Sequence, residues 1–78
     1  MKDYSLPQIQ VIKKLRQGYE LSRHSHYLKC TLLKGQHFET IQYSTVNVLL
    51  KHKLITFTRI GLEKIQYFLT EEGLTTKL

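Results

Sequence analysis

The chain has 78 residues, enough for one small domain with a modest core. Hydrophobic residues make up 41% and charged residues 23%, a composition typical of folded globular proteins that argues against a disordered chain. Twelve Lys and Arg residues against six Asp and Glu give a net charge of +6, which favours a polyanionic partner: nucleic acid, an anionic membrane surface or an acidic protein.

The sequence also predicts the compartment. Cys30 is the only cysteine, so a disulfide within the chain is excluded and a reducing compartment is favoured. The first twenty residues lack the apolar stretch of a signal peptide, and no run approaches the ~20 apolar residues of a membrane span. We therefore predict a cytoplasmic protein that does not enter a membrane, in the style of bacterial and phage proteins.

The first predicted element is a helix over residues 7–17, after a short flexible lead over residues 1–6. Ser5-Leu6-Pro7 is typical of a helix start, with Ser5 or Leu6 as the cap and Pro7 in the first turn. Apolar residues then recur near helical spacing, and Gly18 supplies a stop.

Residues 19–33 change to a period of two. Tyr19 and Leu21 alternate with polar residues, residues 23–26 form a polar break, and alternation resumes through Cys30 and Leu32. This pattern predicts a β-hairpin, and residues 34–37 are the next predicted turn.

Residues 40–54 return to helical spacing, with Ser44 as a predicted N-cap and Thr40 as a cap of an earlier turn. A second hairpin is predicted over residues 55–70, with its tip at 59–64, and residues 74–78 are predicted to be a frayed tail. The prediction is therefore a single α+β domain over residues 1–78, in the order α-β-β-α-β-β, with two helices packed against two β-hairpins.

Two segments of the second half carry a family resemblance. The run Tyr43-Ser44-Thr45-Val46-Asn47-Val48-Leu49-Leu50-Lys51-His52-Lys53-Leu54-Ile55 is followed by Tyr67, Leu69, Thr70 and Gly73 in a Tyr-x-Leu-Thr-x-x-Gly pattern. These segments resemble the recognition helix and wing of winged helix-turn-helix DNA-binding proteins, in particular the small phage and bacterial α-β-β-α-β-β type. The resemblance covers about residues 40–73 and implies a winged-helix-like fold that binds DNA.

Helical spacing places Val46, Leu49, Leu50 and Leu54 on one side of this helix, toward the core. The opposite side is a short polar face with a cationic end, which suits a major groove because the groove is wide enough to admit a helix. There we expect Asn47 to contact an adenine edge, Val48 a thymine methyl group, and Ser44 or Thr45 a phosphate. The cationic end is formed by Lys51, His52 and Lys53, and the two lysines are expected to contact the DNA backbone. A solvated helix face is the alternative interpretation.

The predicted wing tip adds Arg59 and Lys64, which would reach phosphate or the minor groove or would serve solubility alone. Ile60 and Leu62, between them, would cap the core or contact a second copy. The first helix adds Lys13, Lys14 and Arg16, as part of the footprint or as a solvated face. The aromatic residues are mostly expected in the core, although an exposed Tyr27 or Phe68 would stack on an unpaired base, which keeps single-stranded nucleic acid or RNA open as a partner.

No metal site, cofactor or catalytic centre is predicted. A zinc site beside His24 and His26 would need three or four ligands in a suitable geometry, and the alternation around Cys30 predicts a buried thiol instead of a ligand. The acidic residues are scattered, no glycine-rich phosphate loop is present, and so small a domain has little room for a deep pocket. The protein is therefore predicted not to be an enzyme.

The sequence leaves two functional hypotheses. The first is a DNA-binding module, a small transcriptional regulator of phage or mobile-element type, which would bind as a homodimer because one helix reads few base pairs. The second is a protein-interaction module on the same scaffold, an inhibitor or assembly factor whose basic face meets an acidic protein.

Overall fold

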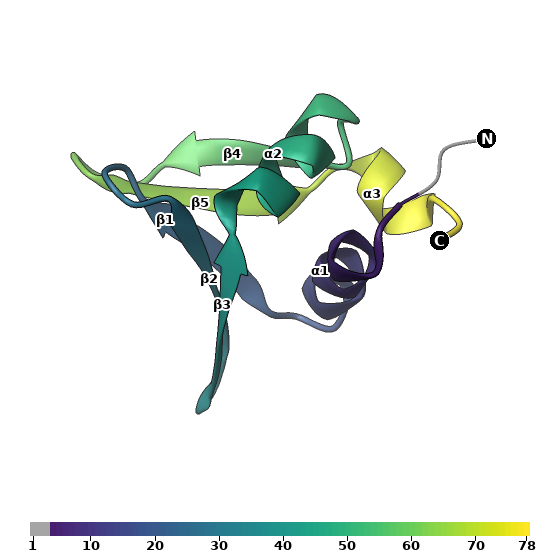
Figure 1. The fold of residues 1–78 in the computed structure, drawn as a ribbon, viewed down its shortest axis with the longest axis horizontal. Coiled ribbons are helices and arrows are strands. Elements are labelled where there is room, and N and C mark those ends of the chain that lie inside the picture. The colour runs from purple at the N-terminus through teal and green to yellow at the C-terminus, as the bar shows by residue number, and fades with distance from the viewer. Residues whose placement is uncertain (1–3) are drawn as a thin grey trace.

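The computed structural model describes residues 4–78 and has an α+β fold (Figure 1). Its elements in chain order are α1 (Leu6–Arg16), β1 (Glu20–His24), β2 (Lys29–Lys34), β3 (His37–Gln42), α2 (Tyr43–Lys51), β4 (Ile55–Arg59), β5 (Lys64–Leu69) and α3 (Glu71–Thr75). The predicted order lacked β3 and α3. The first three residues of the predicted flexible lead lie outside the described residues.

Helix α1 confirms the first predicted element to within one residue at each end. Ser5 is the N-cap: its hydroxyl accepts from the Gln8 backbone N–H, while the Gln8 side chain accepts from the Ser5 N–H. This capping box satisfies two backbone donors that a helix start leaves free. Pro7 lies in the first turn, and Gln17 is the C-cap before Gly18.

The strands form one antiparallel sheet in the order β3-β2-β1-β5-β4. The prediction of two hairpins was therefore incomplete, because β1 pairs with β5 and joins them into one sheet, with Leu21 opposite Tyr67. This pairing satisfies the backbone groups of two edges that separate hairpins would leave open. The predicted polar break at residues 23–26 was also wrong in part, since Arg23 and His24 belong to β1.

Strand β3 was predicted as a turn followed by the start of a helix. Gly35, at a φ of 60°, and Gln36 form a two-residue loop that sends the chain back along β2. The alternation of apolar and polar residues in β3 is weak, because its positions on the core side of the sheet are His37, Glu39 and the half-buried Ile41. Glu39 is instead paired with Lys14 of α1, an interaction that apolar periodicity does not reveal. Thr40, predicted as a cap, lies within β3.

Helix α2 begins before the predicted cap and ends before residue 54. Gln42 is the N-cap, and the Tyr43 N–H donates to the Leu28 carbonyl at 3.0 Å. The β1–β2 loop, and not the Ser44 side chain as predicted, therefore satisfies a backbone N–H at the start of the helix. At the other end, the Lys53 N–H donates to Leu50 and the Leu54 N–H to Leu49. This is a Schellman arrangement that ends the helix, and Lys53 occupies its left-handed position at a φ of 60°.

Helix α3 replaces part of the predicted tail. Thr70 caps it by accepting from the Gly73 N–H, and the Arg16 guanidinium donates to the carbonyls of Gly73 and Thr76. The two ends of the fold are thereby joined, and Figure 1 shows α3 beside α1. The frayed-tail prediction was wrong for residues 74 and 75 because these contacts order α3.

The core lies between the helices and one face of the sheet, where Val11, Ile12, Leu21, Leu32 and Leu49 are fully buried. On the opposite face every strand residue is exposed or half-buried, so this outer face is uncovered. The longest helix, α1, has 11 residues, and no helix in residues 4–78 is long and apolar enough to cross a membrane.

Candidate nucleic-acid interface

One side of α2 presents four of the residues predicted to bind DNA. Ser44, Asn47, Val48 and Lys51 are spaced by three and four, so they form one continuous row on the helix surface, which we call the α2 stripe. Ser44 and Lys51 are exposed, and Asn47 and Val48 are half-buried. Val46 and Leu49 are fully buried on the other side and fix the stripe outward.

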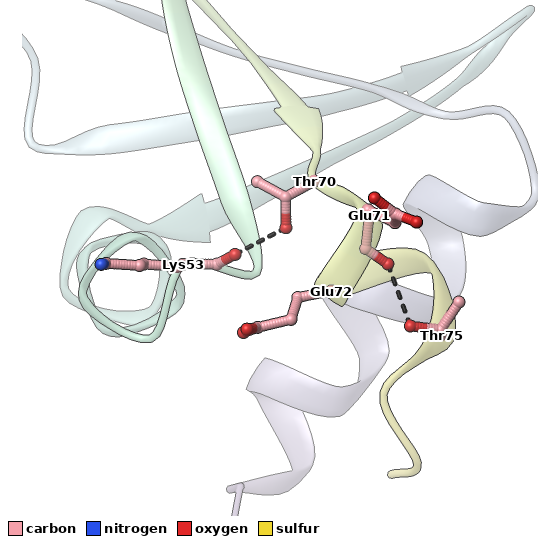
Figure 2. A pocket seen from close by; sticks show the side chains of 5 residues that line it. All are labelled: Lys53, Thr70, Glu71, Glu72 and Thr75. Atoms are coloured by element: carbon pink, nitrogen blue, oxygen red, sulfur yellow. Dashed lines mark hydrogen bonds between the residues drawn. The ribbon is translucent and has the colours of Figure 1, made fainter.

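The other predicted residues of this segment lie beside the stripe or beyond it. Thr45 and His52 are half-buried on its flank, and the His52 ring packs edge-on against Tyr4 with centroids 5.5 Å apart. Lys53 is exposed in the turn after the helix. Its amine points away from the Glu71 and Glu72 carboxylates, with which it lines an open hollow (Figure 2).

The wing residues separate onto two faces of the sheet. Arg59 lies opposite Ile65, whose side chain is buried on the helix side, so Arg59 faces α2. Lys64 lies opposite His24, on the uncovered outer face. Lys64 therefore does not face α2 with Arg59, because alternation along β5 puts Lys64 and Ile65 on opposite faces of the sheet. Ile60 and Leu62 are 45% and 94% exposed, so they do not cap the core as one interpretation proposed.

Beside the α2 stripe lies a hollow of about 210 Å³, which we call the aromatic–arginine pocket. It is lined by Arg23, Tyr43, Leu50, Phe57, Arg59, Ile65 and Tyr67. Asn47 lies between Tyr43 and Leu50 on the helix surface, so the stripe and the pocket are continuous.

Sequence reasoning missed Arg23 and Phe57 as site residues. Arg23 was placed in a turn, although the alternation through Tyr19 and Leu21, continued by two residues, puts it on the helix side of the sheet. Phe57 was expected in the core, but its side chain is 54% exposed. Phe38 and Tyr27 are also exposed. Phe57 is exposed because β4 is an edge strand that is buried only at Ile55.

Arg23 is held in place by a set of hydrogen bonds. Its Nε donates to the Tyr67 hydroxyl at 3.1 Å, and one terminal nitrogen donates to the carbonyls of Ser25 and Tyr27. The guanidinium lies over the Tyr43 ring, 4.2 Å from its centroid, a favourable cation–π distance. The hydrogen bond to Tyr67 raises the pKa of Arg23, so its charge is permanent at physiological pH.

No protein family, curated protein or solved structure matches this chain.

The distribution of acidic residues distinguishes the α2 side from the rest of the surface. Residues 40–62 contain no Asp or Glu but include Lys51, Lys53 and Arg59. The described glutamates lie elsewhere: at the start of β1, in β3 paired with Lys14, at the β4–β5 tip and in α3. An anion approaching α2 therefore meets Lys51 and Arg59 without a carboxylate from this segment, whereas Lys53 shares the open hollow with Glu71 and Glu72. Cations not offset by carboxylates favour polyanion binding.

The cations of α1 contribute less to such a surface. Lys14 is paired with Glu39, and Arg16 donates to backbone carbonyls of α3, so both have partners within the fold. Lys13 is exposed. The interpretation of all three as part of a nucleic-acid footprint therefore loses support for Lys14 and Arg16.

The histidines and the cysteine do not converge. His24 and His26 lie 3.4 and 3.5 Å from the two carboxylate oxygens of Glu63, which ties the β1–β2 turn to the β4–β5 tip. Cys30 is fully buried elsewhere, and burial raises the pKa of its thiol to about 11, which keeps it protonated and unreactive. In residues 4–78, no group of three or more His, Cys, Asp or Glu side chains is arranged to hold a metal ion.

Proposed function

We propose that this protein binds nucleic acid, namely duplex DNA, through α2 and the adjoining β4–β5 hairpin. The observation that carries the proposal is the outward stripe of Ser44, Asn47, Val48 and Lys51 within a segment, residues 40–62, that contains no acidic residue. A helix with a polar outer face and free cations at its C-terminal end suits a major groove, whose width admits a helix.

Each residue has a proposed role. Asn47 pairs with an adenine edge, Val48 contacts a thymine methyl group, and Ser44 binds a phosphate. Lys51, Lys53 and Arg59 neutralise the DNA backbone. Thr45 and His52 border this surface, and Lys64 is left out because it lies on the outer face of the sheet.

The winged-helix resemblance supports this proposal in its second half. An α2 helix followed directly by the β4–β5 hairpin is the order of a recognition helix and its wing. In place of a preceding helix, β3 leads straight into α2. The proposed reading unit is therefore one helix and one hairpin, and we propose that two copies bind adjacent half-sites, as a small phage-type transcriptional regulator would.

Fluorescence anisotropy with a labelled random-sequence duplex tests the proposal. We expect micromolar binding at low salt. Three backbone contacts, from Lys51, Lys53 and Arg59, predict a slope of about −2.7 for the logarithm of the affinity against the logarithm of salt concentration. Affinity should then fall about fortyfold between roughly 50 and 200 mM salt.

Absence of binding at low salt would contradict the proposal. It would favour the second hypothesis, in which the same basic face docks on an acidic protein. A slope near zero would also contradict it, because the binding would then not depend on phosphate neutralisation.

A further inference from the structure

The aromatic–arginine pocket combines arginine and aromatic side chains in an arrangement that the proposed binding of a fully paired duplex does not require. Its floor is set by strand register: Arg59 of β4 and Arg23 of β1 lie on either side of Ile65 of β5. The backbones of β4 and β1 are two strand spacings apart, about 10 Å. The gap above Ile65 is thus flanked by two guanidinium groups.

Aromatic rings form the remainder of the pocket. Phe57 and Tyr67 are directly opposite each other in the next row of the sheet, and Tyr43 and Leu50 of α2 complete the lining. Phe57 is 54% exposed, whereas Tyr67 is buried. The Phe57 ring is therefore the surface that a flat ligand would cover.

The guanidinium groups of the two arginines differ in how firmly they are held. Arg23 is fixed by its bonds to Tyr67, Ser25 and Tyr27 and by its position over the Tyr43 ring. Arg59 is exposed, and its hydrogen bond to the Leu62 carbonyl is long, at 3.4 Å. Arg23 thus supplies a positioned charge, while most of the Arg59 guanidinium is free to take an anion.

The lining contains no carboxylate, so the pocket favours a ligand that is both flat and anionic. Its volume of about 210 Å³ is below the roughly 300–1,000 Å³ of sites that enclose a drug-sized molecule, so it suits a single ring system. Bases of single-stranded nucleic acid bind proteins by stacking on exposed aromatic rings beside basic groups.

We infer that this pocket takes one unpaired DNA base, stacked on Phe57, with the adjoining phosphate on Arg59. The inference rests on the proposed function, because the pocket adjoins Asn47, a residue of the α2 stripe that is proposed to bind DNA. The protein then prefers duplexes that contain an unpaired nucleotide, such as a single-base bulge, over fully paired ones.

Two labelled DNA hairpins with equal numbers of phosphates test this, one fully paired and one with a single bulged thymine. Wild-type protein is expected to bind the bulged hairpin about tenfold more tightly, the scale of one stacked base. Phe57→Ala is expected to remove the preference and leave affinity for the paired hairpin unchanged. Phe68→Ala is the matched control, because Phe68 is a 42% exposed phenylalanine on the outer face, and it should keep the preference.

Thermal melting establishes that each variant is folded. If Phe57→Ala does not fold, Phe57→Leu replaces it, because leucine keeps the apolar bulk without a flat ring. Equal wild-type affinity for both hairpins overturns the pocket inference and leaves the proposed function intact. A preference that survives in a folded Phe57 variant also overturns it. Binding to neither hairpin overturns the proposed function and this inference together.

Discussion

Replacement of Gly73 by alanine is expected to destabilise the fold by about 3 kcal/mol, the upper part of the range for an overpacked core. An added Cβ would overlap the Leu54 carbonyl oxygen and lie 2.9 Å from the Leu69 side chain. The Leu54 oxygen belongs to the backbone and already accepts from the Thr70 N–H, so it cannot move away without loss of this hydrogen bond between the α2–β4 turn and the N-cap residue of α3. Gly73 also accepts from Arg16, which links α1 to α3.

Thermal denaturation followed by circular dichroism measures this effect. A change of about 3 kcal/mol corresponds to a fall in Tm of roughly 12–24 °C for a domain of this size. Glu72→Ala is the matched control, because it adds no atom and lies one residue away on the exposed side of α3, and it should change Tm little. An unchanged Tm for Gly73→Ala would show that α3 does not pack against the α2–β4 turn as described.

The double change Asn47→Ala with Lys51→Ala is expected to weaken binding to the preferred duplex about 100-fold. An amide–adenine pair contributes about 1–3 kcal/mol of discrimination, and loss of a phosphate contact adds to it. The preferred duplex is first selected from a random pool. On random-sequence DNA, the same variant should lower the salt slope by about one, since a single cation is lost.

The pair Gln10→Ala with Lys13→Ala is the control for this variant. It also removes one amide and one positive charge from a helix surface, here from two exposed positions of α1. We expect nearly unchanged affinity for the preferred duplex. Full affinity in the Asn47–Lys51 variant, or equal losses in both variants, would exclude α2 as the reading helix.

Local sequence signals sufficed for those elements whose start and burial depend on nearby residues. The cap at Ser5 and the apolar spacing of α1 located it to within one residue. The β4–β5 hairpin was located in the same way, from the alternation of Ile65 and Tyr67.

The missed elements depend on contacts distant in sequence. Strand β3 has Glu39 at a core-side position, and only the ion pair with Lys14 explains it. Helix α3 has five residues, too few for a periodic signal, and it is held by Arg16 from the other end of the chain.

The candidate site divides in the same way. The α2 stripe follows from helical spacing alone, so four of its residues could be grouped from the sequence. The separation of Arg59 from Lys64 follows from the register of the β4–β5 hairpin, whereas the approach of Arg23 to Arg59 depends on the pairing of β1 with β5. That pairing joins residues 40 to 46 positions apart in the chain, and no local pattern specifies it.

Nuclear magnetic resonance mapping of the ¹⁵N-labelled protein with a duplex at low salt tests the central claim most directly. We predict shifts at the backbone amides of Ser44, Asn47, Val48 and Lys51 and at the Nε–H of Arg59. Outer-face residues such as Thr31 and Thr40 should be unaffected. Shifts concentrated on the outer face, or no shifts at all, would contradict the proposal that this protein binds DNA through α2.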